Sequence, residues 1–164
     1  MRALSKLNDL LAATIKIAVV VMVAVMLASL SGQVVMRYAF NVALSWSEEL
    51  SLTLFCWVVL LSAALCVREN RHVRMTLLIE RVPQALRPNA ERGIYLLTAL
   101  FGGYLAASGT TYFLETRGMT SSAIAYPIEY LYAAAPICGA LIALFAIELA
   151  FAGTIPASED DVDV

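Results

Sequence analysis

The sequence predicts an all-α membrane protein with four transmembrane helices and an amphipathic helix on the cytoplasmic side. The main observation is four apolar runs without a charged residue, each 17 to 21 residues long. A helix rises about 1.5 Å per residue, so each run would span roughly 25 to 32 Å, close to the ~30 Å hydrocarbon core of a bilayer. Composition agrees, because 61% of the residues are hydrophobic, 15% are charged and the mean hydropathy is +0.79. Unpaired backbone groups are costly in lipid, so these runs must be helical.

The four runs cover residues 17–36, 50–67, 94–114 and 131–147. With their flanks they predict spans at about 15–36, 48–67, 94–114 and 131–152, packed as one bundle within residues 1–153. Residues 154–164 are acidic and lack patterned apolar residues, so we expect a disordered tail there. A cleaved signal peptide is an alternative for the first run, but the run is longer than the usual apolar stretch of about 7–15 residues.

The distribution of Lys and Arg predicts the orientation of the bundle. The N-terminal flank and the loop after the second run hold nine of these residues, whereas the other two loops hold only Arg37 and Arg117. Basic residues concentrate on the cytoplasmic side of membrane proteins. We therefore expect both termini and the second loop in the cytoplasm, with the first and third loops facing outward.

The loop between the second and third runs contains a helical apolar pattern at residues 74–87. Its apolar residues recur three or four positions apart, with charged residues beside them: Met75, Leu78, Ile79, Val82 and Leu86. This spacing is typical of a helix that lies in the membrane plane or against a partner, and Pro83 would stop or kink it. The alternative is a basic juxtamembrane loop that only follows the topology.

The segment that opens the second span carries two neighbouring carboxylates, Glu48 and Glu49. Ser45 and Glu48 have the three-residue spacing of a capping box, in which each side chain bonds a free backbone amide near the other. Both carboxylates also suit the positive end of the helix dipole. We therefore interpret Glu48 as structural and expect Glu49 to face a partner.

Two charged residues lie within the apolar ends of the spans. Lys16 stands at the inner end of the first span and Glu148 near the inner end of the fourth, so their similar depth predicts a partly buried ion pair. The alternative is that the lysine snorkels to the interface.

Small residues in the third and fourth spans predict close helix contact: Gly102, Gly103, Ala106, Gly109, Gly139 and Ala140. Pro136 predicts a kink early in the fourth span.

Aromatic residues gather near the outward ends of the spans: Tyr38, Phe40, Trp46, Tyr112, Phe113, Tyr126, Tyr130 and Tyr132. An aromatic belt at the membrane interface and a docking platform for an external protein both fit this pattern. Arg37 and Arg117 would form one docking patch if the first and third spans are neighbours. The alternative is that both arginines anchor the interface or pair with nearby carboxylates.

The sequence contains no pattern for a cofactor, a metal site or enzymatic catalysis. Cys56, Cys66 and Cys138 lack Cys-x-x-Cys spacing, and His72 is the single histidine. The spans have no carboxylate near their middle, where ion and substrate pathways commonly carry one. A basic stripe for nucleic acid is also missing. We therefore expect neither enzyme activity nor transport by this chain alone.

Three short motifs follow one another along the chain: RYAF at residues 37–40, LSWSEEL at 44–50 and HVR at 72–74. A Tyr126-Pro127 turn and an Ala135-Pro136 pair come later. Together they resemble the small membrane subunit (Q-type) of tripartite ATP-independent periplasmic (TRAP) transporters, over roughly residues 33–140. The chain departs from the family at Thr76, because members often have an acidic residue there.

The resemblance implies an accessory subunit in the bacterial inner membrane. In such systems a soluble periplasmic protein captures an organic anion, and a large membrane subunit moves it with a sodium gradient. The small subunit supports the large one and helps to dock the binding protein. The candidate interface residues are Arg37, Tyr38, Trp46, Glu48, Glu49, His72, Arg74 and Arg117. The rival interpretation is a stand-alone four-helix exporter that acts as a homodimer, which would be expected to carry a mid-membrane carboxylate.

Overall fold

The computed structural model describes residues 2–42, 44–69, 87–121 and 125–152, and these residues are almost entirely helical. Their helices are α1 (Arg2–Phe40), α2 (Ser45–Arg68), α4 (Arg87–Glu115), α5 (Glu129–Tyr132) and α6 (Ala134–Ala152). The expected amphipathic helix at 74–87 falls almost wholly outside the described residues, and so does the acidic tail at 154–164.

Three helical segments of the described chain are long and apolar enough to cross a membrane: Asn8–Phe40, Ser45–Arg68 and Glu129–Phe151. They contain the expected spans at 15–36 and 48–67 and almost all of the one at 131–152. The third expected span, 94–114, forms most of α4, which is 29 residues long. Thr, Gly and Tyr residues dilute the apolar character of α4, so it is not among the three segments. The described chain is therefore an all-helical protein with three clearly apolar candidate spans.

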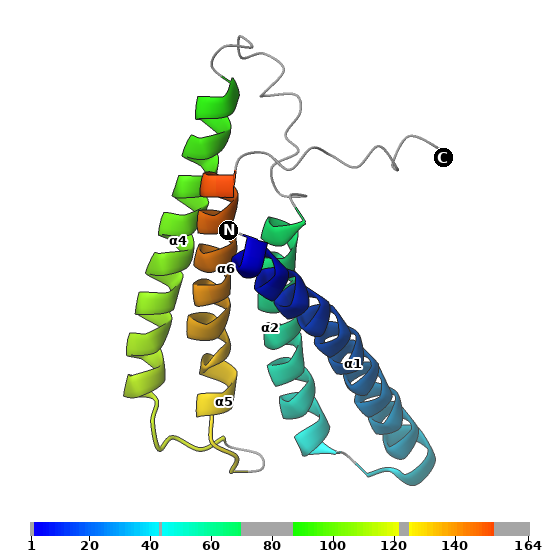
Figure 1. Cartoon of the computed structure of the whole chain (residues 1–164). Helices are drawn as coiled ribbons and strands as arrows, with labels where there is room; N and C mark the ends of the chain where they lie inside the picture. The colour runs from blue at the N-terminus through cyan, green and yellow to red at the C-terminus, as the bar shows by residue number, and fades with distance from the viewer. Residues whose placement is uncertain (1, 43, 70–86, 122–124, 153–164) are drawn as a thin grey trace, which may run out of the picture.

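The long helices pack side by side in the order α1, α2, α6, α4 (Figure 1). α1 and α4 run from one end of this row to the other, and α2 and α6 run in the opposite direction, so the row has two distinct ends. We call one the charged end; there α1 begins while α2 and α6 finish. We call the other the loop end; it carries the α1–α2 connection at residues 41–44 and the segment 116–128 before α5. Every site described below lies at one of these two ends.

Glycines set the distance between α4 and α6. A Cβ atom added at Gly139 would lie 2.5 Å from the backbone nitrogen of Ala106, and one at Gly102 would lie 2.7 Å from that of Ala143. Such contacts are too short for any residue with a side chain, so these positions let the two backbones touch. The predicted close contact is confirmed at Gly102, Ala106, Gly109 and Gly139. It is not seen at Gly103, where an added Cβ would meet nothing within 4 Å, or at Ala140, which is exposed.

The fourth apolar run is interrupted near its start. α5 ends at Tyr132 and α6 begins at Ala134. A proline ring clashes with the carbonyl four residues before it, which for Pro136 is that of Tyr132. The predicted bend therefore takes the form of a break in the helix at Ala133. After the break, α6 buries Cys138, Ile142, Phe145 and Ala146 against its neighbours and forms the centre of the core.

Candidate functional site

The charged end holds a cluster of ionised side chains from three helices. Arg68, at the end of α2, is the central residue, and its side chain is only 8% exposed. One guanidinium nitrogen lies 2.5 Å from Asp9 on α1, and another lies 3.4 Å from Glu148 on α6. Glu148 is also nearly buried and accepts a hydrogen bond from the amide of Asn8. The cluster therefore joins α1, α2 and α6 through one buried cation.

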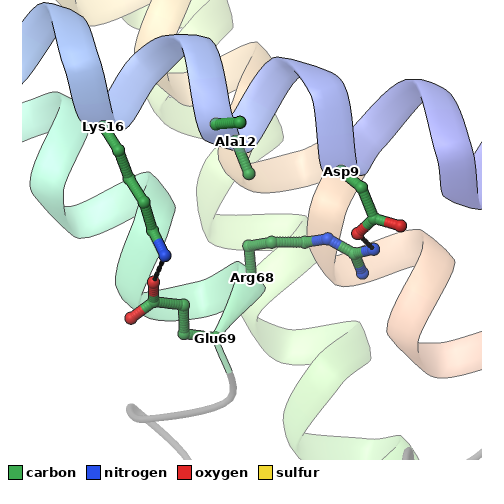
Figure 2. Close-up of a pocket in the computed structure, with 6 residues that line it drawn as sticks. Asp9, Ala12, Lys16, Arg68 and Glu69 are labelled. Atoms are coloured by element: carbon green, nitrogen blue, oxygen red, sulfur yellow. Dashed lines mark hydrogen bonds and ion pairs between the residues drawn. The ribbon is translucent and has the colours of Figure 1, made fainter.

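A cavity of about 300 Å³ opens beside this cluster. Figure 2 shows Asp9, Ala12 and Lys16 on one face of α1, all directed toward the end of α2. Lys16 forms an ion pair with Glu69, and its side chain stays more than half exposed. The charges that line the cavity are thus paired with each other, two cations with two anions.

This geometry corrects the predicted pair between Lys16 and Glu148. Both residues do lie at the charged end, as their depth in the sequence indicated. Arg68 nevertheless occupies the position next to Glu148, while Lys16 reaches Glu69 on the far side of the cavity. Arg68 follows directly after the second apolar run, so its position in the sequence indicates a loop charge rather than a buried one.

At the loop end, polar side chains join α1 to α2. Ser47 is fully buried and donates a hydrogen bond of 3.0 Å to the carbonyl oxygen of Ser29, and the two hydroxyls lie 2.8 Å apart. Four residues further along α1, the amide of Gln33 donates to the carboxylate of Glu48 at 2.7 Å. Glu48 therefore stabilises the contact between two helices.

The predicted capping box is wrong. Leu44 occupies the N-cap position of α2 and forms no side-chain cap, because Ser45 is already inside the helix. The carboxylate of Glu48 is bonded to Gln33. The structural role assigned to Glu48 is retained, but its physical basis is an interhelical hydrogen bond.

A second polar stripe on α2 contacts the segment 116–128. Glu49, Thr53 and Trp57 are spaced four residues apart, so they lie on one face of the helix. Glu49 accepts a hydrogen bond from the hydroxyl of Ser121. The Thr53 hydroxyl lies 2.8 Å from that of Tyr126, and the indole of Trp57 donates to the carbonyl oxygen of Tyr130 at 2.9 Å. Glu49 was expected to face a partner, yet in this chain it holds a loop.

The other predicted interface residues lie apart from one another. Tyr38 is 83% exposed at the end of α1, and Trp46 is partly exposed at the start of α2. Arg37 and Arg117 are both exposed, but Arg37 lies in the last turn of α1 and Arg117 follows α4, and these helices stand at opposite edges of the row. The structure does not bring the two arginines into one patch. His72 and Arg74 lie outside the described residues.

Sequence reasoning missed Arg68, Thr53 and Trp57. The four-residue spacing of Glu49, Thr53 and Trp57 was a usable signal, since it places three hydrogen-bonding groups on one face of an apolar helix.

In the part of the chain that the structure describes, no group of three or more His, Cys, Asp or Glu residues is placed to hold a metal ion. The three cysteines are free.

Long apolar helices with polar clusters at their ends define a multi-pass membrane protein. A family model described as tripartite ATP-independent periplasmic transporters, DctQ component, matches residues 22–154. This match covers most of the chain, so the protein belongs to the DctQ family of TRAP transporter membrane components. The resemblance seen in the sequence motifs is thereby confirmed, and the protein is a multi-pass component of the inner membrane.

Individual relatives agree with this assignment. The chain is 28% identical over 120 residues to the sialic acid TRAP transporter small permease protein SiaQ of Vibrio cholerae, covering 69% of each chain. It is 31% identical over 117 residues to the C4-dicarboxylate TRAP transporter small permease protein DctQ of Rhodobacter capsulatus, covering 68% of this chain and 50% of that one. A shorter match, 46% identical over 50 residues, covers 31% of a Haemophilus influenzae relative.

One relative is much longer than this chain. The sialic acid TRAP transporter permease protein SiaT of Haemophilus influenzae is 31% identical over 97 residues. The matched segment is 59% of this chain but only 15% of SiaT. A segment similar to this chain is therefore part of a longer permease polypeptide in that organism.

Proposed function

We propose that this protein is the small accessory subunit of a sodium-driven TRAP transporter for organic anions. The observation that carries the proposal is the DctQ family match over residues 22–154. The arrangement of charges supports an accessory role, because in the described helices the ionised clusters lie at the two ends of the row. A pathway for ions or anions within one chain commonly carries an ionisable group deep in the membrane.

We further propose that α4 is a fourth transmembrane helix within one bundle covering residues 1–153. Its stretch 94–114 has no charged residue, and its glycines pack closely against α6, which is clearly apolar. With four spans, both termini lie on the same side. The excess of Lys and Arg in the N-terminal flank and in the loop after α2 supports a cytoplasmic location for the charged end. In this proposal the amphipathic segment 74–87 and the tail 154–164 lie on the same side.

Cysteine labelling tests this topology. Asn41 and Asn89 are exposed at opposite ends of the row. In a chain whose three native cysteines are replaced, Asn41→Cys should react with a membrane-impermeant maleimide from outside the cell, whereas Asn89→Cys should react only after permeabilisation. Labelling of both from outside would overturn the four-span topology.

The main partner in this proposal is a large multi-span permease subunit. The similarity to a segment of the longer SiaT permease supports it, because a segment joined to a permease in one organism is expected to bind a separate permease chain in another. The exposed apolar side chains of α1 and α4 offer ample surface for such contact. Within the candidate span Asn8–Phe40, only 11% of the most apolar stretch is buried, and within Glu129–Phe151 the share is 39%.

The second partner is a periplasmic substrate-binding protein that docks at the loop end. Two relatives carry sialic acid or C4-dicarboxylate in their names, and both compounds are organic anions. Selection of the anion would lie with the binding protein and the large subunit. The small subunit would supply a rigid support and part of the docking surface.

Reconstituted transport tests the accessory role. The purified binding protein is first screened for the organic acid that raises its thermal stability, and that acid is then used as substrate. Liposomes containing both membrane subunits should take it up when a sodium gradient and the binding protein are present. Liposomes containing only the small subunit should take up none, and uptake by this chain alone would refute the proposal.

A further inference from the structure

The segment 116–128 is built as a small folded unit in its described residues. The amide of Ser121 bonds the carbonyl oxygen of Tyr126 at 2.9 Å, and the amide of Ile128 bonds that of Met119 at 3.1 Å. Gly118 has a positive φ of 82°, which turns the chain away from α4, and its amide donates to Glu129 at 2.9 Å. The segment therefore forms a turn closed by its own backbone.

Three side chains of α2 hold this unit at separate points. Glu49 contacts its first half through Ser121, Thr53 contacts its second half through Tyr126, and Trp57 contacts the start of α5 through Tyr130. The partners of Thr53 and Trp57 are each 73 residues away in sequence. The contacts are spaced one helical turn apart along α2, so together they fix both the position and the tilt of the segment.

We propose that Glu49, Thr53 and Trp57 are positioning residues that hold the segment 116–128 in the shape required for docking the binding protein. We call this set of contacts the α2 strap. The inference rests on the proposed function, since it assigns a docking role to the loop end. It deepens that function by naming the surface and the residues that shape it.

The exposed side of the segment has the composition of a protein interface. Met119 is 55% exposed, and Arg117 and Pro127 are exposed as well. Tyr130, in α5 directly after the segment, is 65% exposed. Met, Tyr and Arg are enriched where proteins bind one another. The segment follows the last residue of α4, so this surface projects beyond the ends of α4 and α5. The partner that fits is a soluble protein with an apolar patch and a carboxylate opposite Arg117.

Rigidity of the segment raises the affinity for the binding protein, because a flexible segment would have to become ordered when the two proteins bind. Ordering a loop on association reduces affinity, and a loop held in the bound shape avoids that loss. Each neutral hydrogen bond shifts a local opening equilibrium by about fivefold when it is removed. Loss of one strap contact should therefore raise both the opening of the segment and the concentration of binding protein needed.

The test uses the assembled two-subunit transporter in lipid nanodiscs. Thr53→Val removes one hydroxyl without changing side-chain volume, and Tyr126→Phe removes its partner. Thr110→Val is the matched control, because the Thr110 hydroxyl bonds only Ala106 within its own helix. Hydrogen exchange of the segment 116–128 is measured first, and binding of the purified substrate-binding protein second.

Exchange of the segment should accelerate about fivefold in Thr53→Val and in Tyr126→Phe, and the double variant should be no faster than either. Thr110→Val should leave it unchanged. Unchanged exchange in both strap variants would overturn the strap, whatever happens to binding. Faster exchange with unaltered affinity for the binding protein would overturn its docking role. If the wild-type complex binds no binding protein at all, the proposed function itself fails, which is a separate result.

Discussion

The ion cluster at the charged end depends on a single side chain, that of Arg68. Its guanidinium reaches Asp9 and Glu148 at once, and so it connects three helices at the charged end. The sequence correctly indicated that Lys16 and Glu148 lie at similar depth. It did not indicate their partners, because the choice between Lys16 and Arg68 depends on which helices are neighbours and on how each one is rotated.

Removal of Arg68 should strongly destabilise the protein. Arg68→Met leaves the nearly buried Glu148 without its cation, and breaking a buried ion pair in this way costs about 3–5 kcal/mol. The double change Arg68→Met with Glu148→Gln should recover much of that loss, because no buried charge is left unpaired. Thermal unfolding in mild detergent measures both variants.

Lys16→Met provides the control for this experiment. Lys16 is more than half exposed, and exposed ion pairs contribute at most about 1 kcal/mol. Its loss should therefore lower the unfolding temperature much less than the loss of Arg68. Equal decreases in unfolding temperature for Lys16→Met and Arg68→Met would show that burial of the Arg68 ion pair does not increase its contribution to stability.

Ser47 should matter more for stability than Glu48. The Ser47 hydroxyl is buried and bonds both the hydroxyl and the carbonyl oxygen of Ser29, so Ser47→Ala should cost about 1–3 kcal/mol. Glu48 is exposed and bonds only Gln33, so Glu48→Ala should cost less. The same unfolding assay decides the order, and a greater loss from Glu48→Ala would show that the exposed bond to Gln33 stabilises the protein more than the buried Ser47 contacts.

At the scale of the helices, the apolar runs predicted which helices exist better than they predicted where each helix begins and ends. The expected second span began at residue 48, whereas α2 begins at Ser45, because polar residues extend the helix beyond its apolar run. The break at Ala133 was foreseeable from Pro136, as proline acts through local geometry. The start of α2 could not be foreseen in the same way, because Leu44 takes the N-cap position without a capping side chain.

The contact between α4 and α6 should fail when a glycine acquires a side chain. In Gly139→Ala the new Cβ would lie 2.5 Å from the backbone nitrogen of Ala106, so the helices must move apart. Overpacking of this kind typically costs about 1–3 kcal/mol. Gly103→Ala should be neutral or slightly stabilising, because its Cβ meets no atom within 4 Å and alanine favours the helix.

Unfolding temperatures of these two variants, measured side by side, test the close packing of α4 on α6. The comparison is well matched, since both changes add one methyl group to a helix. A similar loss of stability in the two variants would mean that glycine is required for a reason other than helix contact.

At the scale of the whole molecule, the order of neighbouring helices α1, α2, α6, α4 could not be predicted from the sequence. Four apolar runs of similar length can be neighbours in several orders, and only side-chain fit selects among them. The glycines indicated correctly that the third and fourth runs approach closely. The suggestion that the first and third runs are neighbours has no comparable motif behind it, and α1 and α4 in fact stand at opposite edges.

The same row leaves most of the apolar surface uncovered. Large hydrophobic side chains are exposed along α1 and α4, including Val20, Val21, Leu97 and Leu100. Lipid can cover such a surface, and so can a larger membrane protein. An accessory subunit must have part of this surface covered by a specific large partner.

Affinity purification of the tagged chain from membranes of its own organism tests that requirement most directly. After solubilisation in mild detergent, the chain should elute with a single much larger multi-span membrane protein in a fixed ratio. Gly139→Ala, which loosens α4 against α6, should reduce the yield of that partner, and Gly103→Ala should not. Recovery of the chain only with further copies of itself would contradict the accessory role and favour a self-contained exporter.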